Sequence, residues 1–175
     1  MTEKSNRIKC YLYSIIAVII GVAFDQYTKY LAVTNLKGQD SFIIIKDVFQ
    51  LHYLENRGAA FGMLQNQRAF FIFSFVIIIA AILYLYVKLP VTKRFLPLHV
   101  CGILVVSGAI GNMIDRLRLS YVVDFFYFEL INFPIFNVAD IYVVVGVILL
   151  AILLLFVYKD EELDSVFNFK KRAGK

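Results

Sequence analysis

The chain has 175 residues, of which 61% are hydrophobic and 18% are charged, and its formal net charge is +5. Soluble domains are nearer to ~45–50% apolar, so a water-soluble fold of this length cannot enclose this much apolar surface. No basic stripe alternates with aromatic residues, which argues against nucleic acid as a partner. The composition is typical of a protein embedded in a membrane.

Long apolar runs follow one another along the chain, and each can cross the hydrocarbon as an α-helix, which needs ~20 residues. The predicted spans are residues 11–33, 69–87, 95–114 and 138–158. The first run reaches residue 33 only if Asp25 and Lys29 are tolerated within it. The sequence therefore predicts an all-α membrane protein with four transmembrane helices, formed by a single integral membrane domain covering residues 1–175.

The first apolar run follows three basic residues, Lys4, Arg7 and Lys9, as the core of a cleaved signal peptide would. Cleavage needs small residues after the apolar run, however, and Phe24-Asp25-Gln26-Tyr27 stands there. We therefore expect a retained helix. Cys10 and Cys101 have neither the spacing of a metal site nor that of a disulfide framework, so both are expected to be free thiols.

Basic residues gather in the N-terminal tail, in the loop at residues 88–94 and in the C-terminal tail. Four spans place these three segments on one side, and the positive-inside rule makes that side the cytoplasm. Residues 34–68 and 115–137 are then extracytoplasmic. Within them, residues 41–53 and 121–131 are rich in β-branched and aromatic side chains, which predicts a small extracytoplasmic β-rich cradle at the membrane surface.

An ionisable residue in a span costs ~2.5–3.5 kcal/mol to insert and indicates a functional site. The predicted topology brings Asp25, Asp115, Asp124 and Asp140 to the same membrane face. Asp124 lies inside an apolar run and needs a partner, and Asp140 is a candidate. When two carboxylates share a dry site, their pKa values separate, so that one holds a proton while the other is charged. Such a pair can activate water for amide hydrolysis.

Several features of this face also have a purely structural explanation, although none accounts for Asp124. Asp25 and Lys29 are spaced i, i+4, so they can form an ion pair at a helix end or shape a site. Asn137 is a plausible helix N-cap, and Asp140 near a helix N-terminus is stabilised by the macrodipole. The small residues at 107–111 permit close helix packing.

Four short blocks of residues follow one another in a fixed order along the chain. They are Asp25-Gln26-Tyr27-Thr28-Lys29, Asn56-Arg57-Gly58-Ala59-Ala60-Phe61-Gly62, Gly108 to Arg116 running into Val122-Val123-Asp124-Phe125, and Phe136-Asn137-Val138-Ala139-Asp140. Together they resemble the lipoprotein signal peptidase (signal peptidase II) family, over about residues 21–158. The resemblance implies an intramembrane aspartic endopeptidase. Such an enzyme removes signal peptides from prolipoproteins by cleaving on the N-terminal side of the diacylglyceryl-modified cysteine.

The resemblance also implies roles for individual residues. The catalytic pair would be Asp124 and Asp140. Substrate-binding positions would be Asn56, Gly108, Asn112, Arg116, Asn137 and Ala139, and supporting positions would be Asp25, Lys29 and Asp115. Ser107 and Ser120 depart from the family pattern, which often has glycine there, and this puts the local backbone shape in question.

The resemblance implies no metal and no cofactor. The expected partners are diacylglyceryl-modified prolipoproteins and membrane lipid, with no nucleic acid and no obligate protein partner. The expected location is the bacterial cell membrane, as a multi-pass protein with both termini cytoplasmic and the active site near the outer face. Two alternatives remain: a small four-helix multidrug transporter, typically with an acid inside its first span and no β-rich segment, and an assembly subunit that would tolerate amides at the acidic positions.

Overall fold

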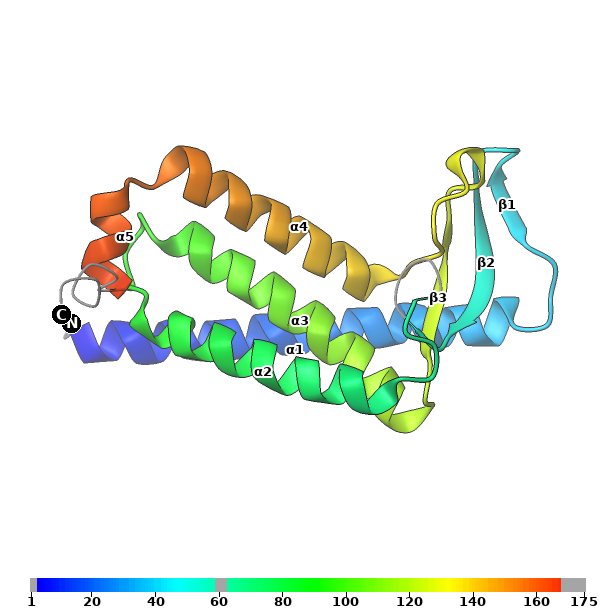
Figure 1. Cartoon of the computed structure of the whole chain (residues 1–175), viewed down its shortest axis with the longest axis horizontal. Helices are drawn as coiled ribbons and strands as arrows, with labels where there is room; N and C mark the ends of the chain where they lie inside the picture. Colours follow the sequence, from blue (N-terminus) through cyan, green and yellow to red (C-terminus); the bar gives the residue numbers. More distant parts are fainter. Residues whose placement is uncertain (1–2, 59–62, 168–175) are drawn as a thin grey trace.

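The structure is a computed structural model that describes residues 3–58 and 63–167. Within this part of the chain, four helices are long and apolar enough to cross a membrane. They are α1 (Glu3–Leu36), α2 (Arg68–Lys88), α3 (Leu96–Arg118) and α4 (Val138–Ile152), which continues as the π-helical turn η3 (Leu153–Val157). The helices lie along the long axis of the molecule (Figure 1). The predicted class, four membrane helices with a small β-rich part, is confirmed.

Two helices extend beyond the apolar runs that predicted them. Helix α1 begins at Glu3 and ends at Leu36, and α3 continues to Arg118, a full turn past Ile114. Hydropathy indicates which residues suit lipid, whereas helical hydrogen bonding continues through polar residues wherever protein or water covers them. Asp115 therefore lies within α3, and its carbonyl accepts the closing bond from the Leu119 N–H at 2.7 Å.

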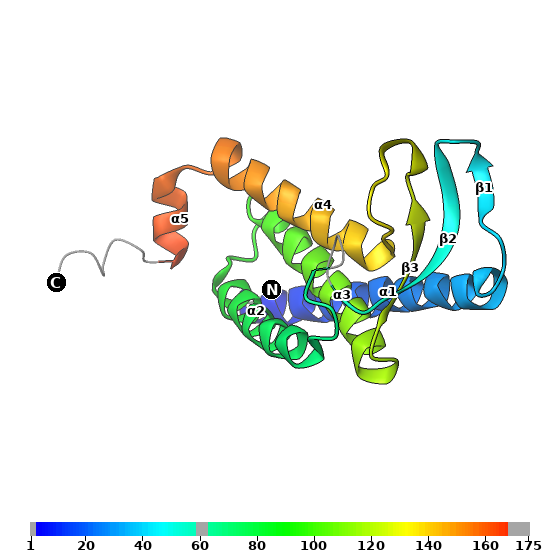
Figure 2. The same ribbon diagram turned by 45° about the vertical axis from the view of Figure 1, so that its right-hand side comes forward.

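A three-stranded antiparallel sheet stands at one end of the bundle (Figures 1 and 2). Its strands are β1 (Phe42–Ile45), β2 (Phe49–Asn56) and β3 (Val122–Tyr127), in the order β1-β2-β3. The short 3₁₀ helix η2 (Glu129–Ile131) follows β3. Leu54 pairs with Asp124 and Asn56 pairs with Val122, so the end of β2 lies beside the start of β3. β-branched and aromatic residues, which favour strands, make up most of β1 and β3, and β2 contains Phe49 and Tyr53.

Helix α3 packs against α1, α2 and α4 and carries most of the buried helical residues, while α2 has none. Glycines permit the closest approaches. A Cβ at Gly108 would lie 2.3 Å from the Ala139 carbonyl oxygen, and one at Gly111 would lie 2.5 Å from Asp25 Oδ2. In a membrane the hydrophobic effect does not drive helices together, because lipid is as apolar as the side chains. Small residues at helix contacts instead let the backbones approach closely and pack. The small residues at 107–111 therefore bring α1, α3 and α4 together.

Helix α5 (Asp160–Phe167), which the sequence analysis did not anticipate, lies at the end of the bundle opposite the sheet (Figure 2). Arg94 binds Glu162 at 2.9 Å, and the Tyr158 hydroxyl donates to the Arg94 carbonyl at 2.6 Å. Tyr158 also stacks on Phe95, with ring centroids 5.4 Å apart. These contacts join the α2–α3 connection to the chain that follows α4.

Candidate active site

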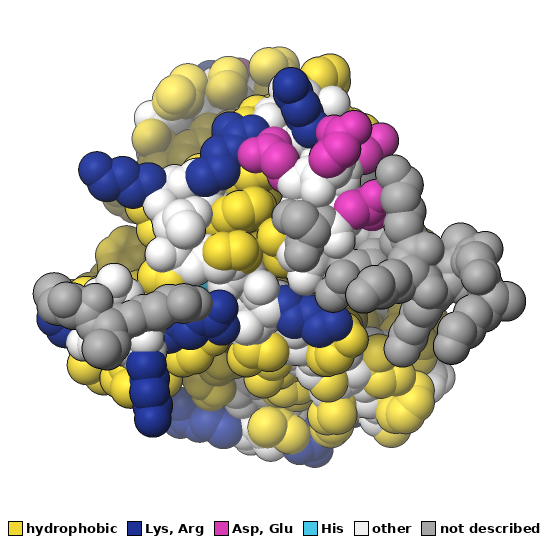
Figure 3. Space-filling view, turned by 90° about the vertical axis from the view of Figure 1, so that its left-hand side faces the viewer, with side chains coloured by type: hydrophobic (Ala, Val, Ile, Leu, Met, Phe, Trp, Pro, Cys, Tyr) yellow, Lys and Arg dark blue, Asp and Glu magenta, His cyan; other side chains and the backbone are white. Residues whose placement is uncertain are grey.

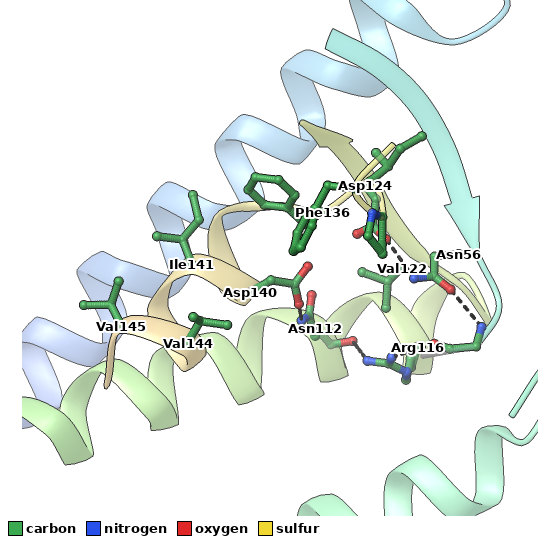
Figure 4. A pocket seen from close by; sticks show the side chains of 14 residues that line it. Asn56, Asn112, Arg116, Val122, Asp124, Phe136, Asp140, Ile141, Val144 and Val145 are labelled. Carbon is green, nitrogen blue, oxygen red and sulfur yellow. Dashed lines mark hydrogen bonds between the residues drawn. The ribbon is translucent and has the colours of Figure 1, made fainter. Parts of the chain in front are cut away.

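A cavity of about 520 Å³ opens where α3, α4, β3 and the end of β2 meet (Figure 4). One wall is polar and consists of Asn56, Asn112, Arg116, Asp124 and Asp140. The other wall is apolar and consists of Val122, Phe133, Pro134, Ile135, Phe136, Ile141, Val144 and Val145, with Gly58 at the edge. Apolar cavities with a few converging polar groups are typical of ligand sites.

Asp124 is held on β3 with only 1% of its surface exposed. The amide nitrogen of Asn56 donates to its Oδ2 at 2.8 Å, and the amide nitrogen of Asn137 donates to its Oδ1 at 2.6 Å. The orientation of Asn56 is fixed because its Oδ1 accepts the Gly58 N–H at 2.9 Å. Burial, and next the negative charge of Asp140, raise the pKa of Asp124 to about 7. Asp124 is therefore suited to hold a proton near neutral pH.

Asp140 lies in the first turn of α4, where the helix macrodipole favours a negative charge. Its Oδ1 accepts from the Asn112 amide nitrogen at 2.7 Å, and its Oδ2 accepts from the Asn137 backbone N–H at 3.1 Å. The Asn137 side chain in turn accepts the Asp140 N–H at 3.0 Å, completing a capping box. The predicted N-cap role of Asn137 is confirmed, and both carboxylate oxygens of Asp140 accept hydrogen bonds.

Asn137 is completely buried and touches both acids, with its side chain on Asp124 and its backbone N–H on Asp140. The neighbouring Phe136 pairs through its backbone with Phe126 of β3, at 3.1 Å from the Phe136 N–H to the Phe126 carbonyl. Strand β3 and the start of α4 are thus joined directly. This bridge explains how two acids from different elements, a strand and a helix, come to share one cavity.

Behind the cavity lies a buried ion cluster formed by Lys29, Asp25 and Asp115. The Lys29 ammonium is 3.0 Å from Asp25 Oδ2, 3.1 Å from Asp115 Oδ2 and 2.9 Å from Asn112 Oδ1. The three partners match the three donors of a lysine. Asp25 and Lys29 therefore form the expected i, i+4 ion pair, and Lys29 also contacts the polar wall through Asn112.

Three of the predicted substrate-binding residues do not line the cavity: Gly108, Asn137 and Ala139. Asn137 lies behind the two acids that it binds. Gly108 and Ala139 form the tight contact between α3 and α4, and Ala139 has no exposed surface. Arg116, in contrast, lines the cavity, donates to the Gly58 carbonyl at 3.2 Å and lies 4.3 Å from the centre of the Phe71 ring. A direct substrate contact for Gly108 or Ala139 stays a prediction.

Sequence reasoning did not assign a role to Gln26 or to the apolar residues 133–136. Gln26 donates to Asp115 Oδ1 at 2.9 Å and to the Gly111 carbonyl at 3.2 Å, so it ties α1 to α3. The sequence feature that could have singled out Gln26 is its place between Asp25 and Lys29 in the first block. Residues 133–135 carry no charged group and lie outside the four blocks, so nothing in the sequence distinguished them from other interfacial residues, whereas Phe136 begins the fourth block.

The two serines that replace expected glycines have different surroundings. Ser120 has a φ of 68°, a left-handed conformation that glycine adopts without strain. Ser107 has a helical backbone and faces Gly21, where an added Cβ would lie 3.0 Å from the Ser107 hydroxyl.

Residues 59–62 of the second sequence block lie outside the described residues. Elsewhere in the described chain, no group of three His, Cys, Asp or Glu side chains is placed to hold a metal ion.

Comparison with known proteins agrees with this arrangement. Residues 16–156 match the family model for signal peptidase (SPase) II. The chain is 46% identical over 144 residues to the lipoprotein signal peptidase of Caldanaerobacter subterraneus subsp. tengcongensis, covering 82% of this chain and 96% of that one. It is 47% identical over 141 residues to the lipoprotein signal peptidase of Symbiobacterium thermophilum, covering 79% and 91%.

Two solved structures of bacterial membrane enzymes have a similar fold. A bacterial membrane enzyme determined by the in meso method superposes with a TM-score of 0.72 at 36% identity, covering 91% of this chain and 92% of that one. A second such structure gives 0.70 at 37% identity, covering 83% and 94%. These matches favour a peptidase over a transporter or an assembly subunit. The chain is a multi-pass membrane protein that belongs to the signal peptidase II family of peptidases.

Proposed function

We propose that this protein is an intramembrane aspartic endopeptidase that removes signal peptides from prolipoproteins, cleaving on the N-terminal side of the diacylglyceryl-modified cysteine. Relatives named lipoprotein signal peptidase support the substrate class. The single observation that carries the aspartic mechanism is the pairing of Asp124 with Asp140. Both acids line one cavity, and Asn137 binds both of them.

The surroundings of the two acids suggest a division of roles. Asp140, at the helix N-terminus with two N–H donors, is the carboxylate that takes a proton from water. Asp124, whose pKa lies near 7, is the protonated partner that donates a hydrogen bond to the scissile carbonyl. Water adds to the carbonyl carbon and gives a tetrahedral intermediate. The proton held by Asp140 then passes to the leaving nitrogen as the C–N bond breaks, which releases a carboxyl-terminated signal peptide and a lipoprotein with a free α-amine.

The two walls of the cavity fit the two parts of such a substrate. The apolar wall continues down α4 through Ile141, Val144 and Val145, where acyl chains or an apolar signal peptide can lie (Figure 4). Each buried methylene of an acyl chain contributes ~0.8 kcal/mol, so a diacylglyceryl group sets the depth of the modified cysteine. Asn112 and Arg116 on the polar wall are placed to hydrogen-bond the peptide backbone.

The proposed orientation puts both termini in the cytoplasm and the cavity near the outer face of the membrane. Its support is the distribution of charge. Figure 3 shows lysine and arginine side chains around the end of the bundle opposite the sheet, with acidic side chains grouped to one side. The start of α1 and the α2–α3 connection supply Arg7, Lys9, Lys88, Lys93 and Arg94 there. Excess Lys and Arg mark cytoplasmic segments.

A purified-protein assay tests the activity and the role of the lipid together. One prolipoprotein is prepared with and without its diacylglyceryl group and incubated with the protein at equal concentration in the same detergent. Mass spectrometry of the products should place the cut directly before the modified cysteine, and the lipidated form should be cut much faster. Equal rates for the two forms would contradict depth-setting by the lipid, and no cut in either form would contradict the proposed function.

A further inference from the structure

A second, smaller hollow of about 90 Å³ lies next to the cavity and shares Asn56 and Arg116 with it. Its lining is polar and basic: Asn56, Arg57, Asn66, Arg68, Phe71, Arg116, Ser120 and Tyr121. We call it the arginine pocket. Its three guanidinium groups come from separate elements, since Arg57 follows β2, Arg68 begins α2 and Arg116 lies in the last turns of α3. None of the roles assigned above uses Arg57 or Arg68.

The positive charge of the arginine pocket is poorly neutralised by the described residues. Arg57 lies 3.5 Å from Glu55, but Glu55 is also bound by Lys37 at 2.9 Å. Arg68 donates to neutral groups, the Leu117 carbonyl at 2.8 Å and the Ser120 hydroxyl at 3.3 Å. Each guanidinium has five N–H donors, so several remain available.

Arg116 differs from the other two arginines. It donates to two carbonyl oxygens, those of Gly58 and Asn112. On the cavity side it interacts electrostatically with the carboxylates of Asp140 and Asp124. The anion-binding capacity of the arginine pocket therefore rests chiefly on Arg57 and Arg68. Asn66 also lines the pocket, the Tyr121 ring lies 5.4 Å from the Arg57 guanidinium, and Phe71 adds an apolar side.

We propose that the arginine pocket binds the phosphate group of a membrane phospholipid. Planar guanidinium groups recognise phosphate through paired N–H donors. At about 90 Å³ the hollow is far smaller than the neighbouring cavity of about 520 Å³, so it suits a single phosphate group better than a whole headgroup. The depth favours a lipid as the source: Arg68 begins an apolar helix and Arg116 lies near the end of another, so the pocket stands at headgroup level. Phe71, just inside α2, would meet the glycerol and upper acyl chain.

Lipid binding to the full-length protein in a neutral detergent tests this site without any need for proteolytic activity. Native mass spectrometry would count bound phosphatidylglycerol, with diacylglycerol as a probe that lacks phosphate and inorganic phosphate as a competitor. We expect phosphatidylglycerol to be retained more strongly than diacylglycerol, which can bind only along the apolar wall of the cavity, and inorganic phosphate to compete only weakly. Arg57→Gln and Arg68→Gln should each weaken phosphatidylglycerol binding about fivefold.

Arg118→Gln is the matched control, because Arg118 is exposed at the end of α3 and does not line the pocket. It should bind phosphatidylglycerol like the unmodified protein. Equal retention of diacylglycerol, or equal losses in Arg118→Gln and the two pocket variants, would overturn the proposal. Binding of inorganic phosphate as tight as that of the lipid would overturn the lipid as the source. Since Arg68 also contacts α3, Arg57→Gln keeps the test decisive if Arg68→Gln fails to fold.

Discussion

Asp25 accepts a hydrogen bond from the backbone N–H of Ala139 at 2.9 Å, which places a carboxylate of α1 directly behind the residue that precedes Asp140. Asp115 does the same for β3, since its Oδ2 accepts the Val123 N–H at 3.1 Å, one residue before Asp124. Lys29 lies between the two carboxylates. The ion cluster therefore holds the backbone beside each of the two candidate catalytic acids.

Replacement of Lys29 by methionine tests the energetic weight of this cluster. Lys29 is 3% exposed, and its loss leaves Asp25 and Asp115 buried without their cation. Breaking a buried ion pair in this way costs about 3–5 kcal/mol in the free energy of unfolding. Lys37→Met is the control, because the Lys37–Glu55 pair is half exposed and such pairs contribute about 0–1 kcal/mol. Similar losses in the two variants, measured by unfolding in mixed detergent, would refute a stabilising role for the cluster.

Gly108→Ala tests whether the α3–α4 contact sets the cavity geometry. The new Cβ would meet the Ala139 carbonyl oxygen at 2.3 Å, a backbone atom that cannot move without shifting α4 and Asp140 with it. Overpacking of this kind costs about 1–3 kcal/mol, and cleavage should fall with it. In Gly102→Ala on the same helix, the added Cβ meets only side-chain atoms of the Tyr86 ring, at 3.0 Å, and no backbone atom of another helix. Cleavage by Gly108→Ala at the rate of Gly102→Ala would show that this contact is not critical.

The sequence predicted the four helices and the strand-forming segments because apolar runs and β-branched stretches are local signals. It also brought Asp124 and Asp140 together, because topology alone puts them on one face. The sequence did not predict the hydrogen-bond partners of these two acids. Nothing local indicates that Asn137 binds both acids, since that depends on the pairing of Phe136 with Phe126.

Two further features were hidden from sequence reasoning for similar reasons. Helix α5 is short and polar, so its position depends on tertiary contacts such as Arg94 with Glu162. The arginine pocket joins residues 57, 68 and 116, which no motif connects. In contrast, the expected glycine preference at position 120 has a visible cause in the positive φ of Ser120.

The protonation of Asp124 should make both stability and activity depend on pH. The pKa of this acid rises from an ordinary 3.8 to about 7 on folding, through burial and the charge of Asp140. Stability from this group is therefore complete below pH 3.8 and is lost as the pH rises through about 7. Relative to Asp124→Asn, the unmodified protein should lose thermal stability between about pH 4 and 7, and its cleavage rate should fall above about pH 7. Parallel stability curves for the two proteins would contradict the raised pKa.

Asn112→Asp tests the hydrogen bond that Asn112 donates to Asp140. Lys29 can only donate, so it fixes the amide of Asn112 with its oxygen toward Lys29 and its nitrogen toward Asp140. The new carboxyl can replace this donor only when protonated. Cleavage by Asn112→Asp should therefore survive at acid pH and disappear as the pH rises, at a lower pH than in the unmodified protein. Asn112→Ala should be about 10–100-fold slower at every pH, since a hydrogen bond to a charged group contributes about 1.5–3 kcal/mol. A normal pH–rate profile for Asn112→Asp, together with a normal rate for Asn112→Ala, would exclude this positioning role.

The most direct test of the aspartic mechanism is the rate of cleavage of a lipid-modified prolipoprotein by Asp124→Asn and Asp140→Asn, each purified and shown to unfold as cooperatively as the unmodified protein. An amide can neither take a proton from water nor donate the proton of the pair, so each variant should be slower by about 10²–10⁴-fold. Asp47→Asn, at an exposed acid in the turn between β1 and β2, should cut at the normal rate. Near-normal cleavage by either of the two cavity variants would contradict the proposed catalytic pair.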